Sequence, residues 1–182
     1  HAYTKAVRTC KTCVGNLFCR VGLQDSIGLG IEIESRLQGV STPAKIKMGV
    51  SGCPRNCAEA TIKDIGVIGI QDGWEVYVGG NGGNRLRPAD LLASAKEPDE
   101  VIRMAGIFLQ YYRENGRFGE RTSSFVERVG LAKIKEAILE DSSLKIVSLG
   151  ERLEASLRVL YDPWEEGRDP VEARQFEELG TA

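Results

Sequence analysis

Residues 43–57 read PAKIKMGVSGCPRNC and join a strand pattern to a turn that carries two cysteines. Residues 44–50 alternate strictly, which places Lys45 and Lys47 on one face of the predicted strand and apolar side chains on the other. The glycine and proline that follow favour a bend, so the strand should end there. We expect a short helix at 55–61, with its N-terminus beside the cysteines.

The residues on either side of this stretch predict further strands and helices. Asp72-Gly73, a pair typical of tight hairpins, should join strands at 65–70 and 74–78. The expected helices cover 16–38, 98–115, 123–130, 131–138 and 144–160, with a short helix opening at Pro88. These elements indicate the α+β class.

The composition limits the class of protein. The chain has 182 residues, a formal net charge of -2 and 42% hydrophobic residues, which is enough for one ordinary domain with a core. Acidic and basic residues nearly balance, so we expect no nucleic acid and no membrane among its partners. No apolar run reaches the roughly 20 residues of a membrane span. We therefore expect a cytoplasmic protein.

One domain followed by a tail is the expected organisation. We assign residues 1–161 to the domain and residues 162–182 to an acidic tail, in which prolines are present and apolar residues are few. The chain begins with His1 instead of methionine, which suggests that it was cut from a longer one.

Closely spaced cysteines suit a metal site better than a set of disulfides. Cys13 and Cys19 form one pair, and Cys53 and Cys57 form another. Iron-sulfur clusters are held by thiolates, in loops where glycine or proline lets the backbone bend. Cys10 and Cys13 together with the second pair could instead hold zinc. Spacing alone leaves an iron-sulfur cluster, a zinc ion and simple buried thiols open.

The residues around the cysteines resemble the cluster signature of the nitrite and sulfite reductase family. The resemblance is strongest to the C-terminal part of the large subunit of its NAD(P)H-dependent assimilatory nitrite reductases. It is carried by residues 12–19 (TCVGNLFC) and 50–60 (VSGCPRNCAEA), and it continues in the same order at 78–83, 120–122, 128–130 and 162–164. It implies the fold of the 4Fe-4S domain of that family, a small mixed sheet with flanking helices.

The same resemblance implies the roles of the cysteines. A 4Fe-4S cluster would be held by Cys13, Cys19, Cys53 and Cys57, and Cys57 would also bridge to the iron of a siroheme. Cys10 has no role in the family and would be a spare thiol. The implied activity is the six-electron reduction of nitrite to ammonia, with electrons passed from the cluster to siroheme.

Lys45 and Lys47 are the candidate catalytic residues. Nitrite is an anion, and a positive pocket both attracts it and stabilises the negative charge that develops as N–O bonds break. The alternative is an ordinary solvated strand face. Two-repeat members of the family carry a similar Pro-x-Lys-x-Lys strand in one half and the cysteines in the other, whereas here both lie in the same half. Our hypothesis is a homodimer in which the lysines of one chain face the siroheme of the other.

Siroheme carries several carboxylates, which need cationic and N–H partners. The nearby candidates are Arg55, Asn56, Arg85 and Arg87. Gly80, in a glycine-rich loop, could let the backbone approach the macrocycle closely, although the loop could equally be an ordinary turn. Arg55-Asn56 stand where sulfite reductases usually have Pro-Asn and a small residue, which favours nitrite over sulfite.

The resemblance also implies partners. An upstream ferredoxin-like half, upstream domains that bind FAD and NAD(P)H, and a small subunit are expected, so this piece alone should be inactive. The competing interpretations are a portion of a sulfite reductase, an iron-sulfur electron-transfer module without siroheme, and a zinc-binding module.

Overall fold

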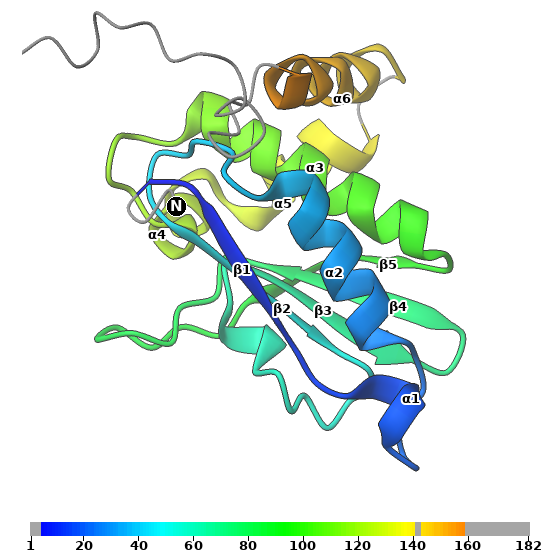
Figure 1. Ribbon diagram of the computed structural model, residues 1–182. Coiled ribbons are helices and arrows are strands. Elements are labelled where there is room, and N and C mark those ends of the chain that lie inside the picture. The colour runs from blue at the N-terminus through cyan, green and yellow to red at the C-terminus, as the bar shows by residue number, and fades with distance from the viewer. Residues whose placement is uncertain (1–4, 141–142, 159–182) are drawn as a thin grey trace, which may run out of the picture.

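The frame of the molecule is a five-stranded mixed sheet. The computed structural model describes residues 5–140 and 143–158. The strands are β1 (Val7–Thr12), β2 (Ile46–Ser51), β3 (Ile65–Ile70), β4 (Gly73–Val78) and β5 (Asp90–Ala95), in this order across the sheet. β1, β2 and β3 are parallel, and β4 and β5 are antiparallel to their neighbours. The mixed sheet with flanking helices confirms the predicted α+β fold (Figure 1).

The hairpin of β3 and β4 forms where the sequence predicted it. The two strands pair without a break, from Ile65 opposite Val78 to Ile70 opposite Gly73. Gly73 has a φ of 140°, and a Cβ atom there would lie 2.2 Å from the carbonyl oxygen of Ala95. The turn therefore requires glycine both for its backbone conformation and for its packing.

Helices cover one face of the sheet. α2 (Ser26–Leu37) packs on β1 and β2, and α3 (Pro98–Asn115) packs on β4 and β5. The other helices are α4 (Thr122–Val129), α5 (Leu131–Lys135), the π-helix η2 (Glu136–Glu140) and α6 (Ser143–Arg158). α6 lies on α3, on the side away from the sheet (Figure 1).

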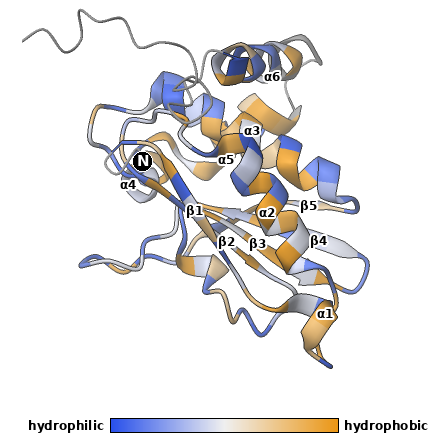
Figure 2. Cartoon of the chain, in the orientation of Figure 1, coloured by the Kyte–Doolittle hydropathy of each residue, from blue (hydrophilic) through white to orange (hydrophobic). Residues whose placement is uncertain are grey.

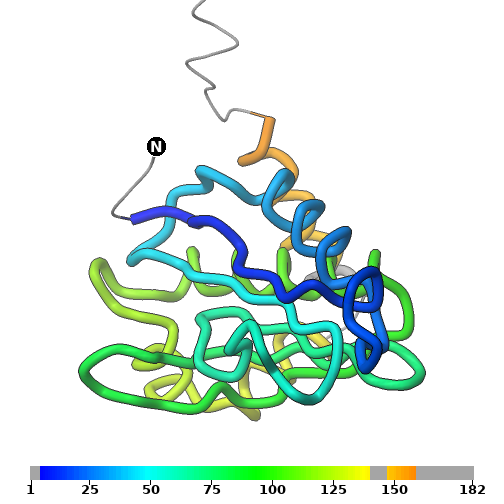
Figure 3. Tube along the Cα trace, turned by 60° about the horizontal axis from the view of Figure 1, so that its bottom comes forward, coloured from blue at the N-terminus to red at the C-terminus, as the bar shows by residue number. Residues whose placement is uncertain are grey.

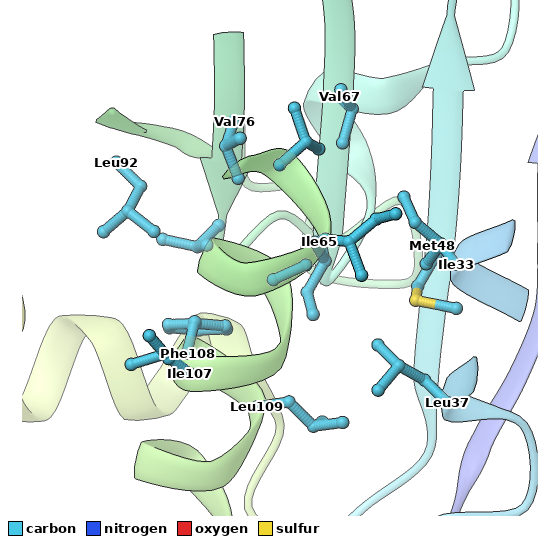
Figure 4. Close-up of a cluster of buried hydrophobic side chains, with 14 of the residues drawn as sticks. Ile33, Leu37, Met48, Ile65, Val67, Val76, Leu92, Ile107, Phe108 and Leu109 are labelled. Atoms are coloured by element: carbon cyan, nitrogen blue, oxygen red, sulfur yellow. The ribbon is translucent and has the colours of Figure 1, made fainter. Parts of the chain in front are cut away.

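The core lies between this helical layer and the sheet. In Figure 4, Met48, Val67 and Val76 of the sheet meet Ile33 of α2 and Phe108 of α3. Burial of such side chains, at about 25 cal/mol per Å² of apolar surface, is the main stabilising contribution to the fold. Since the helices take one face of the sheet, the opposite face, called the outer face below, is left to loops.

Side chains fix the starts of the two long helices that cover the sheet. The Asp25 carboxylate accepts the Gly28 N–H at 2.9 Å at the start of α2. At the start of α3, which opens with Pro98, the Glu100 carboxylate accepts the N–H of the N-cap residue Glu97 at 3.4 Å. These bonds satisfy N–H groups that a helix start leaves free. The cap at Asp25 also anchors the loop that comes just before α2.

The prediction of a helix at 55–61 is wrong. Asn56 and Glu59 adopt left-handed φ values of 55° and 58°, which interrupt a right-handed helix. The segment consists of turns, followed by the short 3₁₀ helix η1 (Ala60–Ile62).

Three other segments also differ from the prediction. Pro88 precedes strand β5 and not a helix, because this stretch pairs with β4. The helix predicted at 16–38 is two helices, α1 (Gly15–Phe18) and α2, with a bend between them. β1 was not predicted at all.

The acidic tail predicted at 162–182 lies outside the described residues, as does the end of the helix predicted at 144–160. Within 5–140 and 143–158, none of the helices has both the length and the apolar character needed to cross a membrane.

Candidate metal centre

The two cysteine pairs lie at one edge of the sheet. Thr12 and Val50 are partners in the pairing of β1 with β2, and parallel strands end at the same edge. The loop after β1 (residues 13–25, the first loop) and the loop after β2 (residues 52–59, the second loop) therefore start side by side. Figure 3 brings this edge forward and shows the first loop, in blue, beside the chain that leaves β2.

Hydrogen bonds join the two loops directly. The Gly52 N–H donates to Cys13 Sγ at 3.1 Å. In return, the Gly52 carbonyl accepts the N–H groups of Leu23 and Gln24 at 2.8 and 3.0 Å. Cys13 of the first pair is thus hydrogen-bonded through its sulfur to Gly52, the residue just before Cys53 of the second pair.

Glycine allows this close approach. A Cβ atom on Gly52 would lie 2.7 Å from the carbonyl oxygen of Gln24 and 2.9 Å from the Cα of Gly15. Gly15 has a φ of 56°, and a Cβ atom there would lie 2.7 Å from Ser26 Oγ. Any side chain at Gly52 would meet backbone atoms and push the loops apart.

The environment of Cys13 favours the thiolate. Partial burial raises the pKa of the thiol, but the Gly52 N–H, the Ser26 hydroxyl and the Gly15 N–H hydrogen-bond to the sulfur and bring the pKa below its ordinary value. Sulfur that accepts backbone N–H groups is well suited to bind a metal as thiolate.

The other three candidate ligands differ in exposure. Cys19 is half-buried, and its N–H donates to the Gly15 carbonyl at 3.0 Å, closing α1. Cys53 is buried, whereas Cys57 is exposed. Cys57 is therefore the thiol of the four that a second bound group can approach from solvent.

Asn56 shapes the second loop. Its Oδ1 accepts the Ala60 N–H at 2.6 Å, and its Nδ2 donates to Thr61 Oγ1 at 2.7 Å. Ser51 Oγ accepts the Ala58 N–H at 3.0 Å. The predicted contact of Asn56 with siroheme stays a prediction, since its side chain is engaged within the loop. Arg55 is exposed, and within the described ranges no hydrogen bond or ion pair holds its guanidinium.

The second loop and η1 lie on the outer face of the sheet. Gly49 of β2 and Gly66 of β3 are register partners, so they lie beside each other on this face. A Cβ atom on Gly66 would lie 2.0 Å from the carbonyl oxygen of Ala60, and one on Gly49 would lie 3.2 Å from that of Ala58. Paired glycines thus let the chain run directly on the sheet.

The donor set fits an iron-sulfur cluster. The four sulfurs belong to free thiols on two loops in contact, with glycines at the contact and an N–H donor on Cys13. In the described part of the chain, no three Cys, His, Asp or Glu side chains lie close enough to share a single ion.

Cys10 is set apart from these thiols. Its side chain faces α2, where a Cβ atom on Gly30 would lie 3.8 Å from its Sγ, and it lines a cavity of about 200 Å³ with Glu34. Burial, with a smaller effect of the Glu34 carboxylate, raises the pKa of Cys10 to about 12. The zinc alternative requires Cys10 as a thiolate, and this environment disfavours that form.

Lys45 and Lys47 lie at the other end of β2. Lys47 comes four residues before Ser51, the last residue of the strand, a separation of about 13 Å at the rise of a β-strand. Lys45 is half-buried and Lys47 is exposed. Lys47 shares the outer face with Gly49, and the second loop runs over this face: a Cβ atom on Gly49 would lie 3.2 Å from the carbonyl oxygen of Ala58, the residue after Cys57.

Asp64, which sequence reasoning missed, fixes the lysine end of β2. Its carboxylate is 1% exposed and accepts the Lys47 N–H at 2.8 Å. It also accepts Arg121 Nη2 at 2.7 Å and the Thr122 hydroxyl. The one sequence signal was that Arg121 and Thr122 fall within a stretch that carries the family resemblance.

The glycine-rich loop packs on η1. The Gly80 N–H donates to the Lys63 carbonyl at 2.9 Å, and a Cβ atom on Gly80 would lie 2.5 Å from that oxygen. Arg87 donates to the Gly79 carbonyl at 2.8 Å and pairs with Asp90 at 2.6 Å. Arg85 is exposed and pairs with Glu127 at 3.1 Å. Arg87 thus closes the loop, and Arg85 extends into solvent.

Comparisons with known proteins give the family. The profile of the family described as "Nitrite and sulphite reductase 4Fe-4S domain" matches residues 3–146. The "Nitrite reductase [NAD(P)H]" of Bacillus subtilis (strain 168) is 53% identical over 166 residues, which cover 91% of this chain and 20% of that protein. The assimilatory-type sulfite reductase of Nitratidesulfovibrio vulgaris is 41% identical over 139 residues, which cover 74% of this chain and 64% of that protein. The chain spans about a fifth of the length of the Bacillus enzyme.

Solved structures share the fold. The dissimilatory sulfite reductase I (DsrI) has a TM-score of 0.64 at 16% identity, with 77% of this chain and 55% of that chain covered. The Mycobacterium tuberculosis NirA protein has a TM-score of 0.63 at 19% identity, with 73% of this chain and 27% of that chain covered. At these identities the likeness concerns the fold.

Proposed function

The chain belongs to the nitrite and sulphite reductase 4Fe-4S domain family, and from this premise we propose that it is the cluster-carrying portion of a cytoplasmic siroheme nitrite reductase. The parent enzyme would reduce nitrite to ammonia with electrons from NAD(P)H. The name of the Bacillus relative supports this substrate and this donor.

One observation carries the proposal: the bond from the Gly52 N–H to Cys13 Sγ. It joins the two cysteine loops, which are far apart in the sequence, at one edge of the sheet. Cys13, Cys19, Cys53 and Cys57 would hold the 4Fe-4S cluster there. When bound, the cluster and siroheme supply electron transfer and a metal site for nitrite.

The second loop provides the contact with siroheme in this proposal. Cys57 is exposed and would serve as the bridging thiolate. Arg55, which is exposed and has no partner among the described residues, would neutralise a siroheme carboxylate. Asn56 would hold the loop in shape beneath the macrocycle. Gly80, Arg85 and Arg87 would line its rim, with Arg85 exchanging Glu127 for a carboxylate of the ligand.

Lys45 and Lys47 are proposed to attract nitrite and supply protons, as residues of a second chain. This arrangement follows the two-repeat members of the family, which carry the lysine strand and the cysteines in different halves, and a homodimer could bring the lysines to the partner's siroheme. Asp64 would hold Lys47 in place through its backbone N–H. The rest of the parent enzyme would contribute a ferredoxin-like half, FAD and NAD(P)H sites, and contacts with a small subunit.

The test is made on the parent enzyme purified without oxygen. Replacing both lysines, as Lys45→Met with Lys47→Met, should abolish nitrite turnover while the siroheme and cluster absorption bands remain. Lys133→Met with Lys135→Met, in the described helix α5, is the matched control and should keep full turnover. Unchanged turnover in the first double variant would refute the role of Lys45 and Lys47. Absence of siroheme bands from the unaltered enzyme would refute the proposed function itself.

Sulfite is the second candidate substrate. The sulfite reductase of Nitratidesulfovibrio vulgaris favours it, because the match covers 64% of that protein. Turnover of nitrite and of sulfite, measured side by side with the same electron donor, decides between the two anions. We expect the ratio of kcat/KM to favour nitrite.

A further inference from the structure

Exposed apolar side chains gather on the first loop. Their exposed fractions range from 38% for Val21 to 80% for Phe18. Together they form what we call the apolar collar: Val14, Leu17, Phe18, Val21 and Leu23. Figure 2 shows apolar colour on α1, which lies beside the start of α2. Elsewhere in the described ranges, the large exposed apolar residues are scattered over separate elements.

The backbone beneath the collar is firmly held. The Asn16 N–H donates to the Gln24 carbonyl at 3.1 Å, and the Leu23 N–H donates to Gly52. The Gln24 side chain also donates to the Ile70 carbonyl at 3.0 Å, which ties the loop to the end of β3. Exposed apolar groups on a fixed backbone are typical of a docking surface, because little conformational freedom is lost when a partner binds.

The collar surrounds the first pair of proposed ligands. Val14 follows Cys13 directly, and Phe18 precedes Cys19 directly. A partner that covers the collar would approach these two thiolates closely. The exposed Cys57, proposed to face siroheme, belongs to the second loop. In this arrangement the first loop would face the partner and the second loop would face siroheme, on separate sides of the cluster.

We propose that the apolar collar is the docking surface for the electron-donating part of the parent chain, which would present an apolar surface around its own redox cofactor. This inference rests on the proposed function. The chain spans about a fifth of its NAD(P)H-dependent relative, so the length needed for such a domain lies outside it. Arg20 is the one charged residue within 14–23, so the contact would be mainly apolar.

Electrons would enter at the collar and leave at Cys57. Three molecules of NAD(P)H, oxidised to NAD(P)⁺, release six electrons and three protons. With five more protons from solvent, these convert one nitrite to one ammonium ion and two water molecules. The collar takes no part in the bond changes; it sets the distance over which electrons pass.

Photo-cross-linking in the intact parent enzyme tests the occupant of the collar. p-Benzoylphenylalanine is introduced at Phe18 and, as the matched control, at Phe118, which is 83% exposed. Phe118 lies far from the collar, because the N–H of the next residue, Gly119, donates to the Pro43 carbonyl near the start of β2. The probe at Phe18 should cross-link to the flavin- or NAD(P)H-binding part of the chain, and the probe at Phe118 should not. Cross-links at Phe18 to a second copy of this domain or to the ferredoxin-like half, or none at all, would overturn the proposal.

Two electron donors separate docking from catalysis. Phe18→Asp should lower NAD(P)H-driven nitrite reduction at least about tenfold, as expected for loss of an interface hot spot. Reduction driven by reduced methyl viologen, a small donor that needs no docking surface, should stay unchanged, as should the electron paramagnetic resonance signal of the cluster. Phe118→Asp should keep both activities.

The outcomes distinguish the inference from the function on which it rests. If the unaltered enzyme does not reduce nitrite with methyl viologen, the proposed function fails. If it does, and Phe18→Asp changes neither activity or lowers both equally, the docking proposal fails while the function stands.

Discussion

The two ends of β2 are built in opposite ways. At the cysteine end, Gly52 and Gly15 remove side chains so that two loops meet backbone to backbone. At the lysine end, the buried Asp64 gathers Lys47, Arg121 and Thr122 around one carboxylate. One end thus brings the two cysteine loops into contact, and the other fixes a charged edge. We therefore expect substitutions at the cysteine end to lower the iron content, and substitutions at the lysine end to lower the free energy of unfolding.

The largest effect is expected at Gly52. Gly52→Val should abolish cluster binding, because its Cβ would lie 2.7 Å from the Gln24 carbonyl oxygen and force the two cysteine loops apart. Iron and sulfide analysis of the anaerobically purified enzyme measures this, with far-UV circular dichroism to check the fold. Gly150→Ala, on α6 where a Cβ meets nothing within 4 Å, is the control. A full complement of iron in Gly52→Val would contradict the account of this end.

The second effect is on stability at the lysine end. Asp64→Ala should lower the free energy of unfolding by about 3–5 kcal/mol, since it leaves Arg121 without its buried partner. Urea unfolding of the 182-residue chain measures the loss. A loss as small as that of a surface ion pair would show that Asp64 does not fix this edge.

The hairpin and the lysine strand could be predicted from the sequence because their signals are local. Asp72-Gly73 and strict alternation identify them without knowledge of the rest of the chain. β1 could not be found in this way, because it is an edge strand with a register shift between Val7 and Cys10, and its residues do not alternate. The helix predicted at 55–61 failed because Asn56 folds back onto its own loop.

The four cysteines were proposed as ligands from family resemblance, and spacing could not choose between iron-sulfur and zinc. The contact between the two loops depends on β1 lying beside β2, a long-range feature that no local pattern contains. Asp64 was missed for the same reason. Its partner Arg121 is far along the chain, and a single aspartate in sequence has no sign of burial.

A third prediction contrasts Cys10 with the thiols of the cysteine end. Burial raises the pKa of Cys10 to about 12, above the value of about 8.5 for a free thiol, so the folded state holds its proton more tightly than the unfolded state does. Its contribution to stability is therefore complete below about pH 8.5 and is lost as the pH rises toward about 12. The unfolding free energy of Cys10→Ser should fall less steeply over this range than that of the unaltered chain. Parallel curves would show that Cys10 is not buried as a thiol.

The smallest effect is expected at Glu59, on the surface of the second loop. Glu59 pairs with Lys11 at 3.0 Å and with Lys63 at 3.1 Å, and these contacts lower the pKa of its carboxyl group. Because the side chain is exposed, Glu59→Gln should barely change the urea midpoint or the iron content. A large loss of iron would mean that the left-handed turn at Glu59 depends on these pairs.

Iron, sulfide and zinc analysis of the anaerobically purified enzyme and its serine variants decides whether the four cysteines hold an iron-sulfur cluster. We expect Cys13→Ser, Cys19→Ser, Cys53→Ser and Cys57→Ser each to lose the 4Fe-4S cluster, as seen also by electron paramagnetic resonance, and Cys10→Ser to keep it. Zinc bound in place of iron, and lost on Cys10→Ser but not on Cys19→Ser, would contradict this expectation.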